Sequence, residues 1–219
     1  MICRGDQRLG VVHQGIRGVI YIAGILFVSA GIVLCKKSGL GISPISSVPY
    51  VLEYVVPMSF GTLTMLFHLI NTGIQMLIRK KIWDAKLLLQ IPLAWLFGQT
   101  INFFQRYISM NDQNILWQCM ALLLSIVFTA LGMVCMLNMH LIVNPPDGAV
   151  KEISGRTGLK FGNVKILYDI SMVVISQAAG IVFCGDIKGV GIGTLLSAVL
   201  IGRMVTGINQ IVGQRRMRL

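Results

Sequence analysis

Six long apolar runs alternate with short polar segments along the chain. They cover residues 18–35, 59–78, 87–104, 115–141, 164–184 and 191–213. A helix rises about 1.5 Å per residue, so roughly 20 apolar residues cross the 30 Å hydrocarbon core of a bilayer. The pattern therefore predicts an all-α, polytopic membrane protein with six transmembrane helices.

Two proline-containing segments interrupt this pattern. Ser43-Pro44 follows the first span, and residues 144–148, Asn-Pro-Pro-Asp-Gly, follow the fourth. Proline lacks an N–H and forces the residue before it out of the helical region, so no helix runs through either segment. We expect a short helix over residues 45–57 and another that begins after Asp147, with Asp147 as its N-cap. Each is too short to cross the membrane, and both a re-entrant segment and an interfacial helix fit the pattern.

A constant offset of 101 residues aligns the two halves of the chain. It places Asn144-Pro145 on Ser43-Pro44 and gives eight identities between residues 27–66 and 128–167. The glycine and proline matches weigh most because these residues set backbone conformation. We interpret the chain as a single transmembrane domain, residues 1–219, built from an internal duplication. Its two repeats cover about 18–107 and 115–213, each with one broken or re-entrant segment.

Lysine and arginine concentrate at alternate ends of the predicted spans. Fourteen lie in the two terminal segments and the linkers after the second and fourth spans, whereas four lie in the other three linkers. Positively charged linkers stay on the cytoplasmic side, so both termini are predicted to be cytoplasmic. Three spans per repeat is an odd number, which makes the second repeat enter the membrane from the opposite side. We therefore predict two inverted three-helix repeats.

Composition supports the membrane class and removes several functions. The chain has 219 residues, of which 55% are hydrophobic and 12% charged, whereas soluble domains carry about 25% charged residues. A net charge of +11 would suggest nucleic-acid binding in a soluble protein, but in a membrane protein basic residues fix the orientation. The expected partner is therefore the lipid bilayer and not nucleic acid. The five cysteines have no metal-binding spacing, and no catalytic motif is present. We expect no metal, no cofactor and no enzymatic activity.

Ionisable residues within the spans are the first candidates for a functional site. Asp169 lies in the fifth span and Arg203 in the sixth, and such groups are costly in a membrane unless they meet a partner or a water-filled cavity. We expect the two to form a direct ion pair, which fits both a structural role and a solute or proton site. The offset of 101 places His68 on Asp169, and histidine titrates near neutral pH.

The two breaks supply the remaining candidates. In inverted-repeat transporters, broken segments meet near the midplane and aim helix N-termini at a solute. Ser43 and Ser46 in the first break and Asn144 and Asp147 in the second are therefore expected to bind solute.

Several short motifs carry a resemblance to a known family. They are Gly39-x-Gly41-x-Ser43-Pro44, Ser59-Phe60-Gly61-Thr62, Asn144-Pro145-x-Asp147, and Gly191-Ile192-Gly193-Thr194 followed by Gly202. In this order they resemble the YczE/YyaS/YitT group of bacterial integral membrane proteins, although Asn102 stands where an acidic residue is expected in that group. The resemblance implies a multi-pass protein of the bacterial plasma membrane and supplies no catalytic residues.

These observations favour a small-solute transporter or permease. Arg203 and helix N-termini attract negative charge, so an anionic or zwitterionic solute is expected, and coupling to an ion or a proton is left open. The alternative is a non-transporting solute-binding or accessory membrane subunit, or a scaffold. A homo-oligomer and an accessory membrane partner both remain compatible with the sequence.

Overall fold

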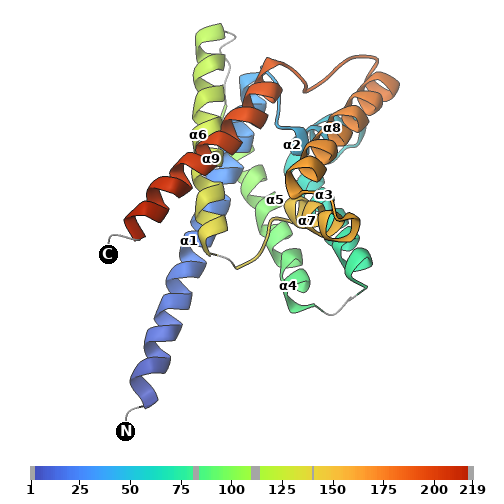
Figure 1. Ribbon diagram of the computed structural model, residues 1–219. Helices are drawn as coiled ribbons and strands as arrows, with labels where there is room; N and C mark the ends of the chain where they lie inside the picture. The colour runs from blue at the N-terminus through green and yellow to red at the C-terminus, as the bar shows by residue number, and fades with distance from the viewer. Residues whose placement is uncertain (1–2, 81–83, 110–113, 140, 217–219) are drawn as a thin grey trace.

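The computed structural model describes residues 3–80, 84–109, 114–139 and 141–216 (Figure 1). Within these ranges all regular structure is helical. Six helical stretches are long and apolar enough to cross a membrane: Gly15–Ser38, Phe60–Arg79, Ala85–Tyr107, Ile115–Met139, Phe161–Cys184 and Ile192–Ile211. The predicted all-α membrane fold with six candidate spans is confirmed.

The helices follow the predicted order, with a short helix in each break. They are α1 (Cys3–Ser38), α2 (Pro44–Val55), α3 (Phe60–Arg79), α4 (Ala85–Leu88), α5 (Gln90–Tyr107), α6 (Ile115–Met139), α7 (Pro145–Thr157), α8 (Phe161–Ala179), the π-helical turn η1 (Gly180–Cys184) and α9 (Ile192–Arg216). The expected third span is divided into α4 and α5, and the fifth ends in η1.

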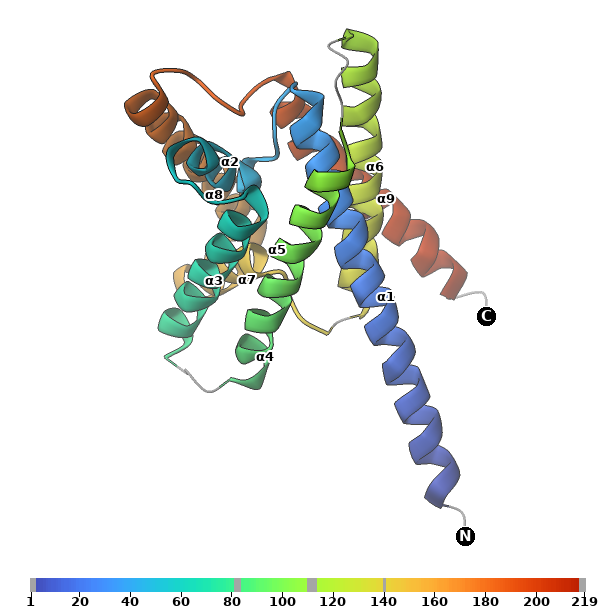
Figure 2. The same cartoon turned by 180° about the vertical axis from the view of Figure 1, so that it is seen from behind.

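The centre of the fold is an antiparallel pair formed by α1 and α6 (Figures 1 and 2). A β-carbon at Gly132 would lie 2.6 Å from the carbonyl oxygen of Gly24, and one at Gly31 would lie 2.8 Å from that of Ser125. Small residues let membrane helices approach until their backbones touch. Between these two contacts the Phe27 and Phe128 rings meet edge to face, with 5.7 Å between their centroids.

The short helices connect the two halves of the chain. At the offset of 101 residues, α2 and α7 begin at Pro44 and Pro145, and α3 and α8 begin at Phe60 and Phe161. Helix α2 packs on α8, whereas α7 packs on α3. The first turns of α2 and α7 are buried in the helical assembly as a result.

The start of α7 corrects one expectation. Asn144, not Asp147, is the N-cap residue, and the helix begins with both prolines in its first turn. The first N–H groups of a helix have no intrahelical partner, so proline costs least there and its fixed φ suits the helix. Asp147 therefore belongs to the first turn, where its side chain is free to pair with another helix.

Two glycine-containing loops meet at the C-terminal end of α1: the loop that follows α1 and the loop that precedes α9. Gly193 donates its N–H to the Leu40 carbonyl at 2.9 Å, and Ile42 donates to the Gly189 carbonyl at 2.8 Å. A β-carbon at Gly41, whose φ is +124°, would lie 2.8 Å from the Gly191 nitrogen. The Gly-x-Gly and Gly-Ile-Gly-Thr motifs thus serve close backbone contact, and no phosphate-binding role is needed to explain them.

The two halves differ in how the last helix packs. Helix α5 lies against α3, where a β-carbon at Gly98 would be 2.7 Å from the Gly61 oxygen and Asn102 Oδ1 accepts the Gly61 N–H at 3.0 Å. The corresponding residues of α9 are Val199 and Arg203. Helix α9 packs on α6, as α5 packs on α1, but it lies apart from α8 in both views (Figures 1 and 2). A bulky residue and a cation at these positions remove the features that let α5 dock.

Candidate functional site

A cavity of about 360 Å³ lies between α3, α5, α6 and the break before α7. Its apolar wall includes Val28, Phe97, Met133 and Met136. In its polar lining the amides Gln75 and Gln90 are buried and the cations Arg79, Lys86 and Lys151 are exposed, and the half-buried Asn144, Asp147 and Glu152 complete it. The exposed cations therefore mark the mouth of the cavity, and the buried amides mark its inner end.

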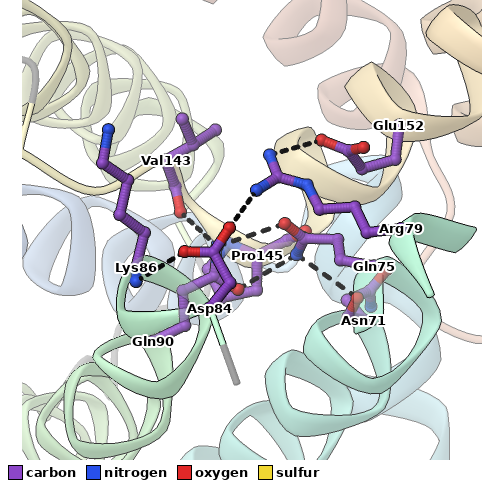
Figure 3. Close-up of polar contacts among 9 residues, drawn as sticks. All are labelled: Asn71, Gln75, Arg79, Asp84, Lys86, Gln90, Val143, Pro145 and Glu152. Carbon is purple, nitrogen blue, oxygen red and sulfur yellow. Dashed lines mark hydrogen bonds and ion pairs between the residues drawn. The ribbon is translucent and has the colours of Figure 1, made fainter. Parts of the chain in front are cut away.

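A pair of glutamine side chains joins the helices at the inner end of the cavity (Figure 3). Gln75 Nε2 donates to Gln90 Oε1 and to the Pro145 carbonyl, both at 3.0 Å. Gln90 Nε2 donates to Gln75 Oε1 at 3.2 Å and to the Val143 carbonyl at 3.3 Å. The hydroxyl of Thr72 donates to Gln90 Oε1 at 2.9 Å.

This network supplies donors to two backbone carbonyls at the break. The Val143 carbonyl precedes α7, and the Pro145 carbonyl belongs to the first residue of that helix. An unpaired polar group is costly in a membrane. Gly148 lies against the network, where a β-carbon would be 2.7 Å from Gln75 Cδ. The break is therefore held in a fixed position against α3 and α5.

Arg79 connects three elements at the cavity mouth (Figure 3). Its guanidinium donates to Asp84 Oδ2 and to Glu152 Oε1, each at 2.6 Å. Asp84 also accepts the backbone N–H of Lys86 at 3.0 Å, which caps α4. That N–H and the Arg79 guanidinium hold the pKa of Asp84 below its ordinary value. The positive charge of Arg79 is thus already matched by two carboxylates.

Two further cations at the mouth are available to a solute. Lys86 and Lys151 line the cavity and are exposed, and neither makes an ion pair within the part of the chain that the structure describes. Both stand on elements that Arg79 holds together, α4 and α7. An anionic group that enters the mouth meets two ammonium groups that form no ion pair among the described residues.

Asp147, Lys165 and Asp169 form a second charged cluster, between α7 and α8. Lys165 Nζ lies 3.1 Å from Asp147 Oδ1 and 3.0 Å from Asp169 Oδ1, so one ammonium serves two carboxylates. Asp169 follows Lys165 by four residues on α8, which places both on one face of the helix. The neighbouring Tyr168 hydroxyl donates to Asn71 Oδ1 of α3 at 2.6 Å. Asp147 belongs to both structures, because it also lines the cavity.

The expected ion pair between Asp169 and Arg203 is not formed. Asp169 pairs with Lys165, and Arg203 is exposed on α9 without an ion pair in the described ranges. Helix α9 does not dock on α8 as α5 docks on α3, so Arg203 lies away from Asp169. The nearest cation to Asp169 is one turn away on its own helix.

A sequence model for a family of unknown function, DUF6198, matches residues 15–210. The chain belongs to this family. No curated protein and no solved structure matches the chain significantly. The DUF6198 match includes both breaks, the cavity, the lysine–carboxylate cluster and all six candidate spans. Only the last residue of the sixth span, Ile211, lies outside it.

The remaining predicted site residues fall in different places. Asn144 lines the cavity together with Asp147. His68 is 3% exposed and stacks on Phe97 at 4.8 Å between ring centroids, beside a smaller hollow that adjoins the cavity. Ser43 donates to Ser46 at 3.1 Å at the start of α2, and neither lines the cavity. The candidates of the second break line the cavity, whereas those of the first bond to each other away from it.

Sequence reasoning missed most of the cavity lining. The missed residues are Gln75, Arg79, Lys86, Gln90, Lys151 and Glu152. The two glutamines carried a usable signal, because long polar side chains within apolar spans face the bundle interior more often than lipid. The charged residues did not, because lysine and arginine beside a span are also expected from membrane orientation alone.

Proposed function

We propose that this protein is a small-solute transporter and that the cavity between α3, α5, α6 and α7 is its solute site. The observation that carries the proposal is a cavity with buried amides and exposed charges inside a six-span helical assembly. Ligand sites combine an apolar wall with a few placed polar groups and a volume of about 300–1,000 Å³, and this cavity fits that description. Intramembrane polar groups are expensive, which favours a functional reason for them.

The charges support an anionic or zwitterionic solute. Lys86 and Lys151 offer free ammonium groups at the mouth, whereas the Arg79 charge is taken up by Asp84 and Glu152. The amides of Gln75 and Gln90 present hydrogen-bonding groups farther in. A solute with a carboxylate and a short polar body matches this order of groups.

Contacts at the centre of the fold support two inverted repeats. Gly24 meets Gly132 and Gly31 meets Ser125. At the offset of 101 residues, Gly24 is equivalent to Ser125 and Gly132 is equivalent to Gly31. The two contacts are therefore exchanged when the repeats are exchanged, as a two-fold axis requires. Phe27 and Phe128 are equivalent residues in mutual contact, which is expected only beside the axis. Because α1 and α6 are antiparallel, the axis lies in the membrane plane, and such repeats are the usual basis of alternating access.

The proposed orientation makes the first prediction. With both termini in the cytoplasm, reporter fusions at residues 81–83 will read inside and those at 110–113 will read outside. The cavity mouth adjoins α4 and α7, so it faces the cytoplasm in this state. The measurement is the ratio of a periplasm-active to a cytoplasm-active reporter at each site. The same side for both fusions would contradict the topology.

Transport itself is tested in proteoliposomes. Radiolabelled L-glutamate, succinate and glycine betaine are the probes, and protein-dependent uptake of at least one is expected. The double variant Lys86→Gln/Lys151→Gln should lower uptake of an anionic probe about tenfold, because two unpaired ammonium groups are lost near its carboxylate. Lys188→Gln, in the loop after η1, is the matched control and should transport normally. Equal loss in both variants would contradict the cavity as the site.

A second candidate function is a non-transporting binding or accessory subunit. It is favoured by the fifth span, of which only 11% is buried, and by the separation of α8 from α9. Such faces suit another membrane protein or a second copy as well as lipid. Solute binding without uptake by the purified chain would favour this candidate. The bacterial plasma membrane as location rests on the resemblance to the YczE/YyaS/YitT group, and the proposal includes no enzymatic step.

A further inference from the structure

The cluster of Asp147, Lys165 and Asp169 carries one more negative than positive charge. The ammonium of Lys165 lies within 3.1 Å of both carboxylates, and no other cation pairs with either within the described residues. Two carboxylates that share one site disfavour each other's ionised form, and burial disfavours the remaining net charge. A single proton would bring the cluster to zero net charge.

The geometry of the contact with Asp169 adds an independent observation. Lys165 Nζ and Asp169 Oδ1 are both shielded from solvent, yet their 3.0 Å contact lacks the alignment of a hydrogen bond. The ion pair offsets only part of the desolvation of this oxygen, because Asp169 shares the Lys165 ammonium with Asp147. A proton on this oxygen would remove its charge.

The surroundings of the cluster contain few other charges. On α3 the nearest titratable group is His68, which lies within electrostatic range of Asp147, and Asn71 is neutral. On α8 the Tyr168 ring lies 5.9 Å from Lys165 Nζ. Helix α2 contributes Ser47, whose hydroxyl contacts the Met172 carbonyl at 3.4 Å. On α7, Glu152 is paired with Arg79, and Lys151 faces the cavity.

We propose that Asp147, Lys165 and Asp169 form a proton-binding site coupled to the cavity through Asp147. This inference rests on the proposed transport function. One proton binds to a carboxylate oxygen of Asp147 or Asp169, and the net charge of the cluster changes from −1 to zero. A negatively charged solute in the cavity lies near Asp147 and favours the protonated form. By thermodynamic linkage, the proton favours binding of that solute to the same extent.

The proton site is tested without any solute. Infrared difference spectra of the full chain in lipid nanodiscs, recorded only above roughly pH 5, where exposed carboxyl groups stay ionised, should show a protonated-carboxyl C=O band. Asp169→Asn should lose this band, and Asp147→Asn should lose or displace it. Both variants keep one carboxylate for one lysine, as the protonated protein does, so they are expected to fold. Asp186→Asn, the same change in the exposed loop after η1, should leave the band unchanged.

Lys165→Met should have the opposite effect from the aspartate substitutions, because it should strengthen proton binding. Without the ammonium, two carboxylates remain together, and the midpoint of the band should rise by about one pH unit or more. A wild-type band that survives both aspartate substitutions would overturn the proton site, as would a midpoint that does not move in Lys165→Met. Because the spectra need no solute, a protein that shows the band but no flux would overturn only the transport function. Transport without the band would overturn only the proton site.

Discussion

Gly132→Leu is expected to lower the free energy of unfolding by about 3 kcal/mol, the upper part of the range for overpacking a close contact. A β-carbon at this position would already lie 2.6 Å from the Gly24 carbonyl oxygen, and a leucine adds three more carbons. The neighbour is backbone of another helix, so it cannot rotate away as a side chain would. Thermal unfolding in detergent, followed by the loss of the monodisperse peak in size-exclusion chromatography, measures the effect.

Gly207→Leu is the matched control for this prediction. Gly207 also lies in a candidate span, but no atom is within 4 Å of its β-carbon position. Substitutions at such open sites usually change stability by less than about 0.5 kcal/mol. If both variants unfold at the same temperature, α1 and α6 do not form the close pair described above.

Gln90→Leu should produce the second large effect, a loss of about 2–4 kcal/mol together with loss of solute binding. The substitution removes the partner of Gln75 Oε1 and of the Val143 carbonyl, whereas the Thr72 hydroxyl keeps the His68 carbonyl as an acceptor. Each buried group left without a partner costs about 1–3 kcal/mol, although the losses are not additive. Thermal unfolding and binding of the radiolabelled probes are the two measurements.

Gln99→Leu on the same helix separates this network from a general effect of the substitution. Gln99 is exposed, and the structure gives it no hydrogen bond among the described residues. It should unfold and bind as the wild type does. Equal destabilisation of the two variants would mean that the glutamine pair does not hold the break in place.

The backbone features of the fold were largely predictable, because they depend on local sequence. Pro44 and Pro145 keep the residue before them out of the helical region and are themselves suited to the first turn, so a new helix begins at each. Apolar runs indicate spans by length alone. The position of α9 was not predictable in this way. The position of α9 depends on a contact between two helices. Gly98 and Asn102 make this contact in the first repeat, Val199 and Arg203 replace them in the second, and hydropathy carries no information about the difference.

In the candidate site too, the residues marked by local sequence were predicted, and those that matter through contacts between helices were not. Asn144 and Asp147 were found because the break marks them. Gln75 and Gln90 were missed because their importance comes from a contact between α3 and α5. Lys165 was counted only as a basic residue that orients the membrane, although its spacing of four from Asp169 makes an ion pair on one helix face expected.

The close contact between α1 and α6 has a consequence for the time course of synthesis. Helix α1 is made first, but the residues that fill its glycine face follow about 100 positions later, which at 5–20 residues per second is roughly 5–20 s. Helices α3 and α5 emerge within that interval and can pack through Gly61 and Gly98. During it, the glycine face of α1 borders on lipid or on the insertion machinery. The central pair of the finished molecule is therefore completed late, and a stall before residue 115 would leave the inserted first half with the glycine face of α1 uncovered.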